Sequence, residues 1–481
     1  MSLASRQSCG LLRSMFALRR SVNLCLAVLL PSAALAHPAQ GGFVLLLPTG
    51  LYITGGCLAV ALSVLIVAGL PDGWLTGLFT PRRLMRTPPL AMARRIISLL
   101  SLALLAWLLW VGFNGPRDPL SNLLPLTIWT LWWIALFTLQ GVVGNLWAWV
   151  NPWRGLHGLL WGDAPPPLRL PARLGHAPAI LVFLAVTGFA LADPAPDDPA
   201  RLAAFVMGYA LFTFAGMALF GADDWLERAE CFTLLLRLFA TLAPLRWHPR
   251  LAIGCPGWAV PQRDVPLSLG LFVIVILGAG SFDGLNDTFW WLAQIGINPL
   301  AFPGRSAVIW PTALGLLGAN LALVLVFAAC VATGHLALRA VDPAAPLPPL
   351  KGAIAHLAMS VLPIAFGYHV AHFLTTFLVN GQYALAALTD PLAKGADLLG
   401  LGQFYVTTGF FNTRATVQAI WLGQAGIIVL AHMLGVLLAH RAAVVLYGRG
   451  HSALIAQIPL AVFMVLYTLL GLWLLAAPRG A

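Results

Sequence analysis

Charged residues are scarce in this chain. Only 9% of its 481 residues are Asp, Glu, Lys or Arg, whereas 60% are hydrophobic and the mean hydropathy is +0.88. A soluble domain carries roughly 25% charged residues, so this chain has too few charges to cover a water-facing surface. The scarcity excludes a cytosolic globular enzyme, a disordered protein and a nucleic-acid-binding protein. It indicates a protein that spans a lipid bilayer many times.

Several functional motifs are absent as well. The six cysteines form no C-x-x-C pair, so neither a disulfide framework nor a thiolate metal site is indicated. The chain also lacks a P-loop, a G-x-S-x-G elbow and a Rossmann fingerprint. These absences argue against an ATPase, a serine hydrolase of the common type and a dinucleotide-dependent enzyme. No internal repeat is visible, so an inverted-repeat transporter is not indicated.

The N-terminal residues 1–36 are typical of a secretory signal peptide. Four arginines flank or precede an apolar run near residues 22–30, and a small-x-small cleavage site ends at Ala36. Cleavage there would leave residues 37–481 as a single polytopic membrane domain, and the alternative is an uncleaved first helix. A new N-terminal His37 would offer its amine and its imidazole to one metal ion. Such a chelate suits Cu(II), although any residue can follow a cleavage site.

Long apolar runs recur along the remaining chain. A hydrocarbon core of about 30 Å needs about 20 residues of apolar helix to cross it. Ten segments after the leader meet this requirement, so the sequence predicts an all-α integral membrane protein, a polytopic bundle of about ten transmembrane helices. The predicted spans lie near residues 50–70, 96–113, 124–149, 177–193, 202–221, 266–285, 307–332, 353–378, 416–440 and 454–477.

The basic residues are distributed unevenly between the loops. If the mature N-terminus lies outside, the predicted cytoplasmic loops carry 17 Lys and Arg residues, and the outside segments carry 6. This bias satisfies the positive-inside rule. Ten spans then place both mature termini outside a bacterial cytoplasmic (inner) membrane. The expected partners are the lipid bilayer and a lipophilic small molecule, and no nucleic acid is expected.

Four histidines lie inside two predicted spans, at His356, His369, His372 and His432. Ionisable groups within a bilayer are costly, so each histidine is a functional candidate. His369 and His372 face one side of their helix, and His432 lies a little below their depth on the next, antiparallel span. Two or three imidazoles with an open position suit Zn, Cu or Fe, so a divalent metal, Zn or Cu, is the predicted cofactor. The alternatives are a proton relay and separate hydrogen bonds to neighbouring helices.

A carboxylate lies at the outer end of the sixth predicted span. Asp283 sits between Gly280 and Gly284, a small-x-x-x-small pair that allows close helix approach. The carboxylate is a candidate to orient a histidine, to act as a general base or to bind a metal. The alternative is a capped helix end with solvated carboxylates.

Two polar stretches are assigned to the membrane surfaces. Residues 223–266 mix charged and apolar residues and are predicted to form a helix in the interface, with Glu230 and Arg237 on one solvated face. The Gly-rich stretch 386–415 is predicted to fold over the outer mouth. Asn151, before a proline, is predicted to end the third span in a turn.

Four short motifs, spread over most of the mature chain, carry a resemblance to a known family. They are Ala36-His37, Asn145 with Asn151-Pro152-Trp153-Arg154, Ser281-Phe282-Asp283-Gly284-Leu285, and Leu362-Pro363 with Tyr368-His369-Val370-Ala371-His372. In these motifs the chain resembles a bacterial family of multi-spanning membrane proteins, mostly uncharacterised, some of which are labelled fenitrothion hydrolase. The resemblance implies a hydrolase that cleaves organophosphorus triesters in the cytoplasmic membrane. It carries over no catalytic residue.

Three functional hypotheses remain open at this point. In the first, His369, His372 and His432 hold a metal that polarises a lipophilic phosphotriester and lowers the pKa of a bound water toward ~7, with Asp283 as base or orienting group. In the second, a channel or transporter relays protons or passes a metal ion such as copper. In the third, the protein is a membrane scaffold. A path through both leaflets would favour transport, a one-sided pocket would favour an enzyme, and histidines without a shared cavity would favour a scaffold.

Overall fold

The protein is an all-α polytopic membrane protein, as the sequence predicts. Its computed structural model describes residues 44, 47–86, 88, 90–162, 164–261, 264–345, 347–402 and 404–479. Within these residues nine helices are long and apolar enough to cross a membrane. They are α3 (Thr49–Gly69), α5 (Ala91–Asn114), the run of α6 (Leu123–Pro125), η1 (Leu126–Leu136) and α7 (Phe137–Val143), α11 (Pro199–Phe220), α14 (Leu267–Asn286), η4 (Arg305–Val308) with α16 (Ile309–Val341), the run of α17 (Leu350–Ala358), η5 (Met359–Val361) and α18 (Leu362–Thr389), α19 (Arg414–Tyr447) and α20 (His451–Ala476).

The remaining predicted span, residues 177–193, is the helix α10 (Ala177–Ala192). It has 16 residues, which is short for a membrane crossing that needs about 20. It packs against α14 and α16. The predicted signal peptide, residues 1–36, and the candidate ligand His37 lie outside the described residues.

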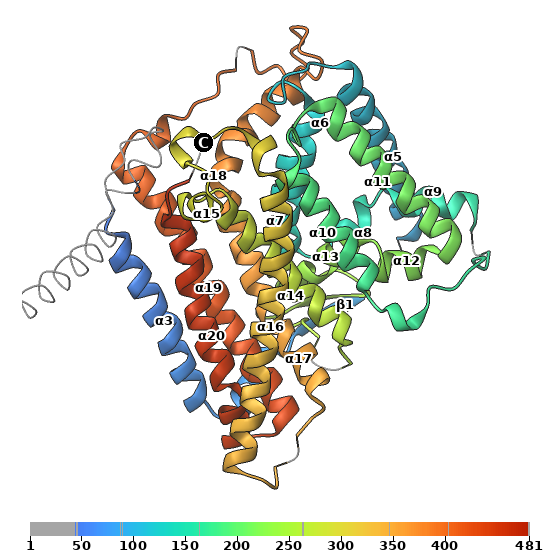
Figure 1. Cartoon of the computed structure of the whole chain (residues 1–481). Helices are drawn as coiled ribbons and strands as arrows, with labels where there is room; N and C mark the ends of the chain where they lie inside the picture. Colours follow the sequence, from blue (N-terminus) through green and yellow to red (C-terminus); the bar gives the residue numbers. More distant parts are fainter. Residues whose placement is uncertain are drawn as a thin grey trace, which may run out of the picture.

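The helices form two groups (Figure 1). In one group α19 packs against α3, α18 and α20, and α16 packs against α14 and α20. In the other group α5 packs against α11 and against the short helix α9 (Trp153–Leu160). The groups meet where η1 runs along α18. Residues that are far apart in the sequence therefore face one another across this junction.

The third span ends earlier than the predicted 124–149. Helix α7 stops at Val143 because Gly144 adopts a positive φ of 112°, which ends the helical backbone. The chain restarts as α8 (Trp147–Val150), where the side chain of Asn145 accepts a hydrogen bond from the Ala148 amide. The Asn151 side chain in turn accepts from the amide of Trp153, the first residue of α9, so this asparagine does form a turn.

The predicted interfacial helix at residues 223–266 is wrong. The segment begins with α12 (Ala222–Arg228) and α13 (Cys231–Ala240), and seven of the ten α13 residues are buried. Helix α13 packs against α7 and α10, so neighbouring helices and not lipid cover its apolar side chains. The periodicity of the sequence alone does not distinguish these two environments.

A small antiparallel sheet joins loops at one end of the molecule, which we call the sheet end. Strands β1 (Arg82–Arg86) and β2 (Leu245–Arg246) both pair with β3 (Arg250–Ile253). The pairing brings the loop before α5 next to the loop after α13. The other short elements are α4 (Asp72–Leu78), η2 (Ala172–Leu174), α15 (Phe289–Gln294), η3 (Pro299–Ala301) and η6 (Gly409–Phe411).

Candidate functional site

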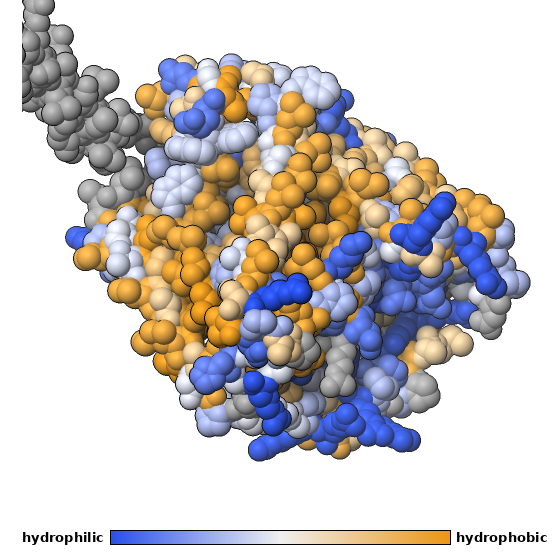
Figure 2. All heavy atoms as spheres, turned by 60° about the horizontal axis from the view of Figure 1, so that its bottom comes forward, coloured by the Kyte–Doolittle hydropathy of each residue, from blue (hydrophilic) through white to orange (hydrophobic). Residues whose placement is uncertain are grey.

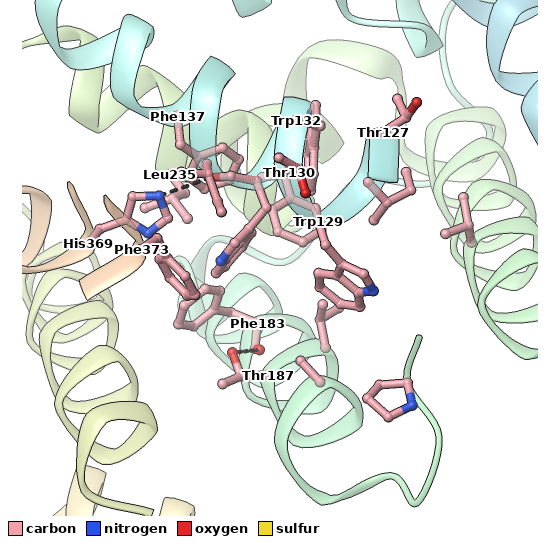
Figure 3. A pocket seen from close by; sticks show the side chains of 18 of the residues that line it. Thr127, Trp129, Thr130, Trp132, Phe137, Phe183, Thr187, Leu235, His369 and Phe373 are labelled. Atoms are coloured by element: carbon pink, nitrogen blue, oxygen red, sulfur yellow. Dashed lines mark hydrogen bonds between the residues drawn. The ribbon is translucent and has the colours of Figure 1, made fainter. Parts of the chain in front are cut away.

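A cavity of about 570 Å³ lies between the two groups of helices. This volume is within the range of roughly 300–1,000 Å³ that small-molecule sites occupy. Aromatic side chains make up much of its wall, and Figure 3 shows Trp129, Trp132 and Phe137 gathered with His369 and Phe373. Its ionisable lining residues are Asp197, Tyr209, Glu230, Asp283, Asp287, Arg305, Tyr368, His369 and His372. We call this space the aromatic cavity.

The helical form of η1 shapes one wall of the aromatic cavity. Residues Leu126–Leu136 are a π-helix, whose turns are wider than those of an α-helix and often occur at functional sites. The Trp133 carbonyl accepts a hydrogen bond of 2.9 Å from Nε2 of His369. A neutral imidazole that donates through Nε2 keeps a lone pair on Nδ1. Figure 3 shows this second ring nitrogen on the side of Phe373.

Asp283 and His372 form a pair on the same cavity wall. Oδ2 of Asp283 lies 3.3 Å from Nε2 of His372, and their side chains are 22% and 9% exposed. The guanidinium of Arg479 is 3.5 Å from the other ring nitrogen, Nδ1. The ring of Tyr368 stacks on the imidazole, with a centroid distance of 5.5 Å and an interplanar angle of 18°. The imidazole of His372 is therefore held by contacts on several sides.

The two glycines of α14 make room for Tyr368. A Cβ at Gly284 would lie 1.7 Å from the Tyr368 hydroxyl, whereas the nearest atom to a Cβ at Gly280 is 3.6 Å away. Tyr368 is 5% exposed, and its hydroxyl makes no hydrogen bond within the described residues. Gly280 and Gly284 therefore leave room for the Tyr368 ring of α18. This close packing of α14 and α18 brings Asp283 next to His372.

The predicted convergence of three imidazoles is not observed. His369 and His372 both line the aromatic cavity, but His432 does not. His432 is buried, and its Nδ1 donates to the carbonyl of Ile428 on its own helix. No group of three or more His, Cys, Asp or Glu side chains is arranged to hold a metal ion in the part of the chain that the structure describes.

Glu230 is a cavity residue that the sequence pattern does not indicate. The predicted solvated face with Arg237 is wrong, because Glu230 is only 1% exposed and Arg237 pairs instead with Glu227 at 2.9 Å. The Glu230 carboxylate caps α13 by accepting from the amides of the next turn, and Tyr209 donates its hydroxyl to the same carboxylate. An acceptor side chain directly before an apolar run was the available signal for this cap.

Charged groups also line the end of the aromatic cavity near α15. Arg305 donates to three backbone carbonyls at the end of α10, which fixes its guanidinium there. Burial raises the pKa of Asp197, and the charge of Arg305 opposes that shift. Burial raises the pKa of Asp287 as well, and the nearby charge of Asp283 raises it further. This end therefore combines one guanidinium with carboxylates whose charged forms burial disfavours.

The segment 386–415 does not cover this cavity as predicted. Helix α18 continues to Thr389, and the cavity-lining residues of the described chain end at Asn380. The loop that follows α18 is held by turns around Asp390 and Asp397 and by two hydrogen bonds between Gln382 of α18 and Thr407.

The geometry and the fold define an integral membrane protein with an internal ligand-sized cavity. Comparison with known proteins adds no name to this class, since no family model, curated protein or solved structure matches the chain. The function is accordingly argued from the cavity itself.

Proposed function

We propose that this protein is an integral membrane hydrolase of lipophilic esters, with organophosphorus triesters as the substrate class. The observation that carries the proposal is the meeting of Asp283, His372 and His369 on one largely apolar cavity inside the helical bundle. Uncharged triesters partition into lipid, and the aromatic wall suits their apolar substituents. The enzyme reading also agrees with the family resemblance of the motifs around Asp283 and His369.

His369 is the proposed general base. Its Nε2–H is fixed on the Trp133 carbonyl, so Nδ1 takes the proton from a water molecule whose oxygen forms the new bond to phosphorus. The bond from phosphorus to the leaving-group oxygen breaks in the same reaction. Asp283 acts as a positioning residue that orients His372 beside the reacting centre. The Arg479 guanidinium supplies positive charge for the developing negative charge on oxygen.

The donor atoms fit a Zn or Cu ion poorly. Nε2 of His369 contacts the Trp133 carbonyl, and both ring nitrogens of His372 face charged side chains. His432 belongs to a different part of the bundle. The mechanism proposed here therefore uses no metal step.

The test is hydrolysis of a chromogenic 4-nitrophenyl phosphotriester by purified protein in lipid nanodiscs. We expect His369→Gln to lower kcat by about 10²–10⁴-fold, the usual contribution of a general base. The matched control is His356→Gln on α17, whose imidazole contacts its own helix at the Gly352 carbonyl and does not line the cavity. Wild-type hydrolysis no faster than that of His369→Gln would overturn the proposal. Elemental analysis of the same samples tests the metal separately.

A transporter of protons or metal ions is the second candidate. A smaller cavity is lined by Asn145 and Ala148, and Trp147, which lies between them in the chain, lines the aromatic cavity. The Gln140 side chain links residues of both cavities, because it donates to Asn145 and to the Leu236 carbonyl and accepts from the amide of Trp147. A proton or copper flux in liposomes that Gln140→Leu abolishes, without triester hydrolysis, would favour this candidate.

We also propose a bacterial cytoplasmic membrane as the location, with both mature termini outside, which requires the 16-residue helix α10 to be the tenth crossing. The support is the excess of arginines in alternate loops of the sequence. In this orientation the sheet end faces the cytoplasm.

A further inference from the structure

A second cavity of about 270 Å³ opens at the sheet end, separate from the aromatic cavity. This volume is about twenty times what one ordered water needs. Figure 2 brings the lower end of Figure 1 forward and shows hydrophilic residues gathered in the lower and right-hand part of the view. The cavity is lined by Arg94, Asn145, Ala148, Trp149, Arg237, Ala240, Thr241, Leu245, Arg246, Trp247, His248 and Ala259. We call it the arginine cavity.

The charge of this lining has one sign. Arg94 comes from α5, Arg237 from α13 and Arg246 from β2, and no Asp or Glu is among the lining residues. Three elements that are distant in sequence thus direct guanidinium groups to one space. Glu227 pairs with Arg237, whereas no carboxylate of the described residues pairs with Arg94 or Arg246, so this lining favours an anionic ligand.

Two of these guanidinium groups are held in place without a carboxylate. Arg94 lies over the ring of Trp149 at 5.0 Å, and Arg246 lies over the ring of Trp258 at 5.5 Å. Neither forms an ion pair with a carboxylate among the described residues. The Nε atom of Arg94 is moreover buried without any hydrogen-bond acceptor in this part of the chain. A buried donor without an acceptor is costly, which indicates that a ligand supplies one.

We propose that the arginine cavity binds a phosphate group. Planar guanidinium groups stacked on indole rings are oriented donors, and phosphate offers several oxygens to more than one of them. The excess of arginines in the loops on this side assigns the sheet end to the cytoplasm. A phosphate bound there belongs to an anionic phospholipid or to a soluble phosphate compound. Both sources share the chemistry that the cavity recognises. The proposal does not depend on the hydrolase activity.

The test measures the affinity of purified protein for phosphatidylglycerol, with phosphatidylcholine as the comparison lipid, by native mass spectrometry. Removing the two carboxylate-free guanidinium groups with Arg94→Gln/Arg246→Gln should weaken phosphatidylglycerol binding about tenfold or more. The matched control is Arg83→Gln/Arg250→Gln, which removes the same charge from exposed positions of the same sheet outside the cavity. This control should keep the wild-type affinity.

A second variant tests the cavity without changing charge. Ala259→Phe places a ring in the arginine cavity and should also weaken binding, so the test stands even if the arginine double variant fails to fold. Inorganic phosphate is titrated in parallel as a competitor. Displacement of the lipid by phosphate, or binding of phosphate alone, assigns the site to a soluble ligand, and binding of the lipid alone assigns it to the membrane. The proposal is overturned if the control pair loses as much lipid affinity as the arginine double variant, or if neither cavity variant loses any.

Discussion

Tyr368 connects the residues of the aromatic cavity to the packing of the bundle. Its ring lies across α14 at Gly280 and Gly284 and stacks on His372. The side chain is buried, and its hydroxyl makes no hydrogen bond within the described residues. It therefore contributes to the packing of α14 and α18 through its shape. The position of Asp283 relative to His372 therefore depends on whether a tyrosine ring fits over two glycines.

Gly284→Ala should destabilise the protein by about 1–3 kcal/mol, the usual cost of overpacking. The new Cβ would lie 1.7 Å from the Tyr368 hydroxyl oxygen and 3.0 Å from its ring carbon Cζ, so the ring has to move. Gly280→Ala is the matched control, because its Cβ would be 3.6 Å from the nearest atom. Thermal unfolding of detergent-purified variants measures both.

Adding Tyr368→Phe to Gly284→Ala should restore part of the lost stability, because it removes the hydroxyl that the new Cβ meets. Unfolding of Gly284→Ala at the wild-type temperature would contradict the packing described for α14 and α18.

The loop after α18 is an element held by two carboxylates. Asp390 accepts from the amides of Lys394 and Gly395, and Asp397 accepts from the amides of Leu401 and Gly402. These backbone hydrogen bonds favour the charged form and lower the pKa of both aspartates. A lowered pKa in the folded state means that the stabilisation is present above the ordinary pKa of Asp, about 3.9, and is lost as the pH falls through the lowered value.

Pepsin digestion measures this loop directly. Cleavage at Leu398 should be slow at about pH 4 and faster once the pH has fallen through the lowered pKa values of the two aspartates. Asp397→Asn should make the loop sensitive already at the higher pH, because the amide offers one acceptor oxygen in place of two. Asp118→Asn, in the turn before α6, serves as the control and should leave this cleavage unchanged. Equal cleavage of wild type and Asp397→Asn at every pH would contradict the assignment.

The whole molecule places its two helix groups around one cavity and its sheet at one end. If the positive-inside rule sets the orientation, the sheet end lies in the cytoplasm and the loop after α18 lies outside. Both regions offer well-exposed side chains, Met85 at 63% and Leu398 at 69%. The orientation is therefore open to a labelling experiment with one cysteine at a time.

In a cysteine-free background, a membrane-impermeant maleimide should label Leu398→Cys in spheroplasts. Met85→Cys should react only after the membrane is permeabilised, because β1 then becomes accessible from the cytoplasmic side. The reverse pattern would invert the proposed topology, and labelling of both positions in sealed spheroplasts would be incompatible with it.

The sequence by itself determined nine of the ten predicted spans, which are helices of membrane-spanning length in the described residues. Apolar runs of spanning length predict helices wherever they occur, because a backbone inside lipid has to satisfy its own hydrogen bonds. The same local logic placed His369 and His372 on one helix face, and that face does line the aromatic cavity. The proline that follows Asn151 likewise predicted a turn at this residue, and the structure has one.

Only the tertiary structure decided which polar groups meet. His369 contacts the carbonyl of Trp133, 236 residues away in the chain, and Glu230 is buried by helices that a solvated-face interpretation ignored. The prediction for His432 was based on its depth in the membrane, but His432 bonds to its own helix and does not line the cavity. Depth alone therefore did not predict its neighbours. Hydrophobic periodicity is a property of one segment, whereas a cavity depends on how several segments pack, and a single sequence carries little signal for that packing.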